Sequence, residues 1–184
     1  RRGGQGKAAA SVKEEDLIQN LYVLSSHVQI LCFTTKGKVF WLKVYEIPVA
    51  SRISKGRPLV NMLNLDDDES VSEILPVDEF SDDKYIFMAT RKGTTKKTNL
   101  SLFAKKYKSG IKAINLDDDD VLIGTAITSG KDEILLASSS GKLIRFSESH
   151  VRPMGRTARG VRGIKLKKGE KLISLMLGDP SKTI

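Results

Sequence analysis

The sequence has 184 residues, 40% of them hydrophobic, and 31 Lys and Arg side chains against 22 Asp and Glu, a formal net charge of +9. This composition is typical of a globular protein with one large or two small cores, and the charge makes an extended polyanion the first partner to consider. No apolar run approaches the roughly 20 residues of a membrane-spanning helix and no signal peptide is recognisable, so we expect a cytoplasmic protein without a membrane partner.

The first seven residues, 1–7, are basic and rich in glycine. Glycine allows main-chain N–H groups to approach a phosphate closely, and the neighbouring bases supply charge. A flexible linker between domains is the alternative interpretation. The candidate DNA contacts in this segment are Arg1, Arg2, Gly3, Gly4, Gly6 and Lys7. The only helix that we expect lies near residues 14–17.

Three repeats of about fifty residues follow, at approximately 20–80, 81–130 and 131–178. Each begins with an apolar strand, a short polar turn with glycine and a second strand. The turn glycines, which are Gly37, Gly93 and Gly141, lie 56 and 48 residues apart. Glycine accepts the positive φ that tight hairpin turns require, so each repeat is predicted to open with a β-hairpin.

A second landmark recurs in step with the hairpins. A basic, irregular stretch ends in Gly56, Gly110 or Gly160, and an aliphatic residue follows four positions later. We expect a short strand there, then an acidic or glycine-containing turn and a further apolar strand. Each repeat therefore predicts a four-stranded blade, and stacked blades bury both faces of each small sheet.

The predicted fold class is all-β and propeller-like, with three complete blades and the start of a further blade at 179–184. A two-sheet sandwich of unrelated strands is the alternative, but it would not explain two landmarks that recur together.

Charge is segregated by phase within the repeat. Residues 30–60 carry six bases against one acid, 84–112 nine against none, and 142–168 nine against one, whereas 61–83 hold nine acids and no base and 113–133 six acids against one base. Stacking would align the basic segments as a curved track and place the acids elsewhere. Such a track binds phosphates without reading bases, although ordinary solvated lysines are the alternative. The predicted contacts are Lys36, Lys38, Arg52, Lys55, Arg57, Arg91, Lys92, Lys96, Lys97, Lys105, Lys106, Lys108, Lys142, Arg145, Arg152, Arg156, Arg159 and Arg162.

Metal binding and catalysis are not expected within this chain. Cys32 is the only cysteine and is predicted to be a buried strand residue, while His27 and His150 are predicted at the surface or in turns. These three side chains cannot form a structural zinc site, and Asp117–Asp120 lacks the ligand spacing of a calcium loop. No phosphate-binding loop, catalytic triad or cofactor motif is present.

The segment Arg1–Gly6 resembles the gyrase A box, Q-R-R-G-G-x-G, without its first Gln. The stretches ILCFTTKGKVFWLKVY, KGRPLVNML, FMATRKGTTKKT and GVRGIKL are similar to blades of the C-terminal domain of the DNA gyrase A subunit, and the resemblance covers essentially all of residues 1–184. It implies a β-pinwheel, a ring of usually six blades that exchange strands with their neighbours. With three complete blades, the chain would form part of such a domain.

The resemblance also implies a function. The domain would wrap duplex DNA around its basic rim with a fixed hand, so that strand passage by gyrase becomes directional and introduces negative supercoils. Its partners would be double-stranded DNA, the rest of the gyrase A polypeptide and the gyrase B polypeptide, in the bacterial cytoplasm at the nucleoid. The nucleophilic tyrosine and the ATPase, with its ATP and Mg, would lie outside this chain.

Three other functions remain open. The equivalent domain of the topoisomerase IV A subunit shares the blade plan but generally lacks an intact box. A protein-binding propeller scaffold is expected to have a more aromatic surface than a chain with 6% aromatic residues provides. A third class is an RNA or anionic-membrane binder that uses the same charge.

Overall fold

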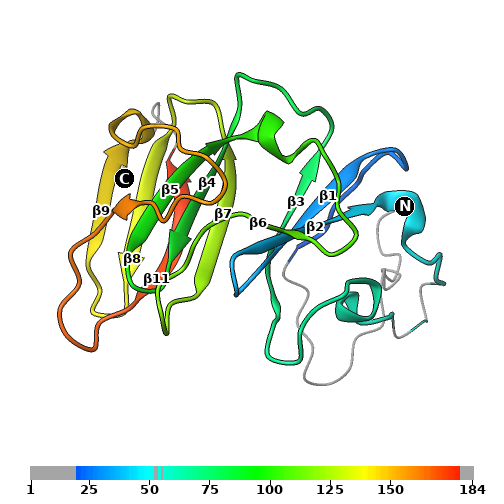
Figure 1. The fold of residues 1–184 in the computed structure, drawn as a ribbon, viewed down its shortest axis with the longest axis horizontal. Coiled ribbons are helices and arrows are strands. Elements are labelled where there is room, and N and C mark those ends of the chain that lie inside the picture. Colours follow the sequence, from blue (N-terminus) through cyan, green and yellow to red (C-terminus); the bar gives the residue numbers. More distant parts are fainter. Residues whose placement is uncertain (1–19, 52–53, 55, 179–184) are drawn as a thin grey trace, which may run out of the picture.

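The computed structural model describes residues 20–51, 54 and 56–178. In these residues the chain forms strands and short 3-10 helices without any α-helix, which confirms the predicted all-β class (Figure 1). Within the same residues no helix is long and apolar enough to span a membrane. The box, the expected helix near 14–17 and residues 179–184 lie outside the described residues.

The strands, in chain order, are β1 (Gln29–Thr34), β2 (Lys38–Lys43), β3 (Val71–Val77), β4 (Tyr85–Thr90), β5 (Thr94–Asn99), β6 (Ile111–Lys112), β7 (Leu122–Thr128), β8 (Glu133–Ser138), β9 (Leu143–Ser147), β10 (Val161–Arg162) and β11 (Leu172–Gly178). The 3-10 helices are η1 (Val44–Glu46), η2 (Leu59–Met62), η3 (Leu100–Phe103) and η4 (Glu148–His150).

Each repeat forms a hairpin and a third strand, but the outer strand of each sheet comes from the following repeat. The first sheet has the order β3-β1-β2-β6 and the second β10-β5-β4-β7, whereas the third is β11-β8-β9. Ile111 of β6 pairs with Val39, and Val161 of β10 pairs with Thr95. This is the strand exchange that the resemblance implied. In the third sheet β9 has no outer partner among the described residues.

The first repeat differs from the expected four-strand plan. Its second landmark, which begins at Gly56, leads into the 3-10 helix η2 instead of a short strand. Pro58 stands where Lys112 and Arg162 stand in the later repeats, and proline lacks the N–H that a strand donates to its neighbour.

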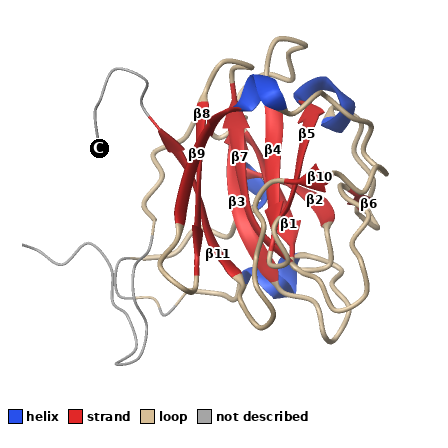
Figure 2. Cartoon of the chain, turned by 90° about the vertical axis from the view of Figure 1, so that its left-hand side faces the viewer, coloured by secondary structure: helices blue, strands red, loops and turns tan. Residues whose placement is uncertain are grey.

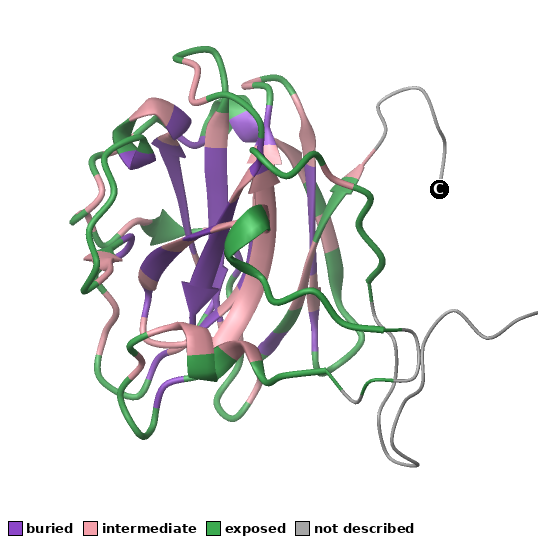
Figure 3. Cartoon of the chain, turned by 90° about the vertical axis from the view of Figure 1, so that its right-hand side faces the viewer, coloured by how far each residue is buried: buried purple, intermediate pink, exposed green. Residues whose placement is uncertain are grey.

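The three sheets stack as layers with a core between each pair. Figure 2 shows the third sheet nearest the viewer and the other sheets behind it. Because side chains alternate across a strand, β4 fills both cores. Ile86 and Met88 pack toward the first sheet, whereas Phe87 and Ala89 pack toward the third. Figure 3 shows the buried strands inside and the exposed connections outside.

Cys32 lies on the other face of the first sheet, in a cluster with Ile30, Phe40 and Leu42 that the segment 59–65 covers. The thiol is fully buried, as predicted, and burial raises its pKa to about 12. Both properties describe an unreactive core residue.

The recurring glycines and aliphatic residues contact one another. Gly37 and Gly93 have φ of +72° and +86°, and a Cβ added to them would lie 2.7 and 2.8 Å from Cγ2 of Ile114 and Ile164. The backbone carbonyl of each glycine also accepts a hydrogen bond from the next repeat, at 2.8 Å in both cases. The two landmarks recur in step because each exchange segment packs on the hairpin turn of the preceding repeat.

Candidate nucleic-acid interface

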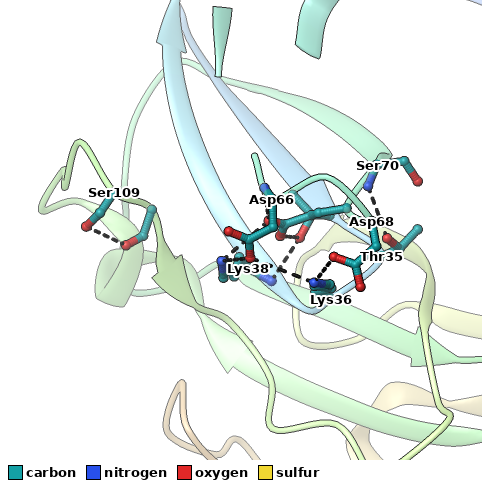
Figure 4. A network of polar contacts seen from close by, with 10 residues as sticks. Thr35, Lys36, Lys38, Asp66, Asp68, Ser70 and Ser109 are labelled. Atoms are coloured by element: carbon teal, nitrogen blue, oxygen red, sulfur yellow. Dashed lines mark hydrogen bonds and ion pairs between the residues drawn. The ribbon is translucent and has the colours of Figure 1, made fainter. Parts of the chain in front are cut away.

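Bases at the tip of the first hairpin lie against carboxylates. Lys38 Nζ lies 2.9 Å from Asp66 Oδ2 and 3.4 Å from Glu69 Oε2, and Lys36 Nζ pairs with Asp68 (Figure 4). The hydrogen bonds to Asp68 and Asp66 raise the pKa values of Lys36 and Lys38. The acidic turn 66–69 therefore neutralises this hairpin tip.

The other two tips repeat the arrangement. Arg91 Nη2 donates to the backbone oxygen of Asp119 at 2.8 Å, and the backbone N–H of Lys92 donates to Asp120 Oδ1 at 2.9 Å. Lys142 lies 3.7 Å from Glu170 Oε2. The expectation that stacking places the acids away from the basic segments is therefore wrong, because each acidic turn folds back onto the hairpin tip of its own repeat.

Two further predicted contacts lie inside the protein. Lys96 and Lys97 of β5 are 0% and 4% exposed. Sheet 2 is covered on both faces, so a lysine on its strand reaches solvent on neither. These side chains bond to protein carbonyl groups, and we remove them from the candidate interface as a correction.

The remaining exposed bases gather on two loops that precede the exchange strands. The first runs from η3 to β6 over residues 104–110, and the second runs from η4 to β10 over residues 151–160. Each crosses to the sheet of the preceding repeat, and Figure 1 shows the second of them, in orange, beside β5. Both loops therefore occupy the same place on successive sheets.

The loops differ from the hairpin tips in their charge balance. Within the described residues, no carboxylate oxygen lies within 4.0 Å of the bases that follow, Arg57 included: Arg57, Lys105, Lys106, Lys108, Arg152, Arg156 and Arg162. Arg156 is half-buried and the others are exposed. Two predicted contacts are paired, Arg159 with Asp117 and Arg145 with Glu133 at 3.1 Å. Arg52, Lys55 and the six box residues lie outside the described residues.

Three exposed lysines that the sequence prediction did not include continue the second loop beyond β10, and these are Lys165, Lys167 and Lys168. They belong to the basic phase 142–168, so the phase pattern itself could have identified them. None of them forms an ion pair among the described residues. We therefore include them in the second loop region, residues 151–168.

The first loop is anchored to the sheet that it crosses. Trp41 Nε1 on β2 donates to the backbone oxygen of Phe103 at 2.8 Å, and the ring of Trp41 lies 6.3 Å from that of Tyr107. Lys105 Nζ sits 5.5 Å from the centre of the Tyr107 ring, within the range of a cation–π contact. Its lysines therefore extend from a fixed backbone.

Comparison with known families matches the model of the DNA gyrase C-terminal domain, beta-propeller, over residues 1–25, 29–78, 84–129 and 132–178. The DNA gyrase A subunit of Salmonella typhimurium is 52% identical over 177 residues, which cover 96% of this chain and 20% of that protein. The DNA gyrase A subunit of Escherichia coli is 51% identical with the same coverage. The chain thus spans about a fifth of the length of these relatives.

Two solved structures share the fold. The C-terminal domain of DNA topoisomerase IV superposes with a TM-score of 0.77 at 31% identity, over 84% of this chain and 48% of that one. The DNA gyrase A C-terminal domain gives 0.68 at 25%, over 84% and 49%. The fold alone does not separate these relatives, but the matched family model and the identities above 50% to gyrase proteins do. The chain belongs to the DNA gyrase C-terminal domain family, with the β-pinwheel fold.

Proposed function

We propose that this chain binds duplex DNA without sequence preference along its two basic loops, residues 104–110 and 151–168, and bends the duplex around the stacked sheets. The observation that carries this proposal is the contrast in charge balance. Bases at the hairpin tips face acidic turns, whereas most bases on the two loops have no carboxylate partner among the described residues. Uncompensated bases on successive sheets are suited to successive phosphates.

The energetics support wrapping as well as binding. Smooth bending of 20–30 base pairs by 40–90° costs on the order of 1–6 kcal/mol. Each phosphate that a lysine or arginine neutralises releases counterions, and several such contacts offset this cost. Because the contacts go to the backbone, affinity should depend little on base sequence.

In the full protein, we propose that wrapping with a fixed hand makes strand passage by gyrase directional. The box at residues 1–7 would add backbone and side-chain contacts to phosphates. The gyrase B polypeptide and the remainder of the gyrase A polypeptide would supply ATP hydrolysis and DNA cleavage, and this chain would contribute no catalytic group. The names of the relatives support this context, since they are gyrase proteins.

The test compares two sets of three charge removals. One variant carries Arg152, Arg156 and Arg162 changed to Ala, and its control carries Lys36, Lys38 and Lys142 changed to Ala. Equilibrium affinity for duplex DNA is measured across a salt series. The loop variant should bind more weakly, with a log–log salt slope shallower by roughly 0.9 for each phosphate that is no longer neutralised, while the control changes less.

Equal losses of affinity in the two variants would show that only total charge matters and would contradict the two-loop interface. Salt-insensitive binding, or binding confined to one short sequence, would contradict the proposed backbone recognition.

A further inference from the structure

Strand β5 carries the two buried lysines, and both hold the second basic loop. Lys97 Nζ donates to the backbone oxygen of Glu148 at 2.9 Å, and the Lys97 carbonyl accepts from the Met154 N–H at 2.8 Å. Lys96 Nζ donates to the backbone oxygen of Arg156 and, at 2.6 Å, to that of Ala113. The start and the middle of the loop are therefore fastened to β5.

The first sheet uses its equivalent positions in a comparable way. Strand pairing places Trp41 and Lys97 opposite Leu31 and Phe87, so the two residues occupy the same position in successive sheets. Each donates a side-chain hydrogen bond to a main-chain carbonyl in the 3-10 helix of the following repeat. A donor at this position therefore holds the next loop in both sheets.

Lys96 is the unusual member of its own set. Its equivalents are Phe40 in the first sheet and Ile144 in the third, both apolar. The fold thus accepts an apolar side chain here, and a buried ammonium group costs free energy that packing does not require. Within the described residues, no carboxylate oxygen lies within 4.0 Å of Lys96 Nζ.

We propose that Lys96 is a positioning residue for DNA binding: it fixes the backbone at Arg156, and its buried charge favours phosphates on the loop that carries Arg152, Arg156 and Arg162. This inference rests on the proposed function and adds to it a residue that contacts no DNA. Arg156 is the charged group that the loop places near Lys96, and Lys112, beside Ala113, instead donates to Asn115 Oδ1 at 3.1 Å. Glu148 pairs with Lys97 on the opposite face of β5.

A consequence for proton binding follows from this geometry. Burial, followed by the charge of Arg156, lowers the pKa of Lys96 to about 7. A phosphate bound at Arg156 offsets that repulsion and favours the protonated amine. DNA binding should therefore take up protons near neutral pH, and affinity should fall as the pH rises through 7.

The experiment compares Lys96→Met with Thr98→Val in the same 184-residue chain. Thr98 is buried two residues along β5, on the same face, and its hydroxyl has no hydrogen-bond partner among the described groups. We expect Lys96→Met to bind duplex DNA about three- to tenfold more weakly, with a salt slope shallower by roughly one or two contacts of 0.9 each. Thr98→Val should keep the wild-type affinity and slope.

A second measurement does not depend on the folding of the Lys96 variant. Calorimetry in buffers of different ionisation enthalpy gives the protons taken up by the wild type on binding DNA near pH 7.5. The same uptake in His150→Gln excludes the exposed histidine next to the loop, and Lys96→Met, if circular dichroism shows it folded, should lose it.

Unchanged slope in a folded Lys96→Met variant, or no proton uptake by wild-type protein that does bind DNA, would overturn this inference and leave the proposed function standing. Failure of the wild type to bind DNA would instead overturn the proposed function.

Discussion

At the scale of single residues, neighbours decide what each basic side chain does. Lys96 and Lys105 belong to the same basic segment of the sequence, yet one is 0% exposed and the other lies on an open loop. Local composition could predict the charge of residues 84–112, but not which lysines would be covered by a second sheet. That depends on strands brought in from the next repeat.

The buried charge of Lys96 predicts a pH dependence of stability. Its pKa of about 7 in the folded protein lies below the ordinary value of 10.5. Between these values the unfolded chain binds more protons, so the stability that this residue contributes rises with pH, by at most about 1.4 kcal/mol per unit. Lys96→Met should therefore gain most over the wild type at and below pH 7, and its advantage should shrink toward pH 10. Urea unfolding across this range measures the difference, and a gap independent of pH would contradict the assignment.

Glu170 predicts the opposite behaviour in acid. Hydrogen bonds from the Lys167 N–H, at 2.7 Å, and from the hydroxyls of Ser140 and Ser138 lower its pKa to about 2. A depressed carboxyl pKa contributes stability above its unfolded value, and this is lost as the pH falls. Glu170→Gln should be less stable than the wild type at pH 7, and the two melting temperatures should converge between pH 4.5 and 2. If their difference is the same at pH 7 and pH 2.5, these bonds do not stabilise the ionised form.

At the scale of the elements, strand exchange ties each hairpin turn to the next repeat. Gly93 has Ile164 against it, whereas the equivalent Gly141 has no atom within 4 Å of an added Cβ. Both have positive φ, so alanine strains either turn, by roughly 1 kcal/mol. At Gly93 the clash with Ile164 adds about 1–3 kcal/mol. Gly93→Ala should therefore lose clearly more unfolding free energy in denaturant than Gly141→Ala, and equal losses would contradict the packing described for this turn.

Much of this arrangement could be predicted from the sequence, because glycine turns and apolar strands recur with the repeat. The partner of each short strand could not. Ile111 and Lys112 form only a two-residue strand, and periodicity does not show that they pair with Val39 and Lys38 of the preceding repeat. Pro58 was the available signal that the first repeat would lack this strand.

At the scale of the whole molecule, segregation of charge along the sequence does not mean segregation in space. Asp66 follows Lys38 by 28 residues, yet their charged atoms lie 2.9 Å apart. The hairpin tips are thereby compensated, and the excess positive charge that remains lies largely on the two loops. The predicted basic track is thus narrower than the phase pattern alone indicated. Its role in DNA binding stays a prediction.

The most direct test of wrapping is the topology of closed DNA. Nicked circular DNA is incubated with increasing amounts of the protein, ligated, freed of protein and resolved as topoisomers. Wrapping with a fixed hand predicts that the centre of the distribution moves in one direction, in proportion to the bound protein, and that the variant lacking Arg152, Arg156 and Arg162 moves it less. A distribution that stays centred where protein-free DNA is centred, at concentrations where binding is saturated, would contradict handed wrapping.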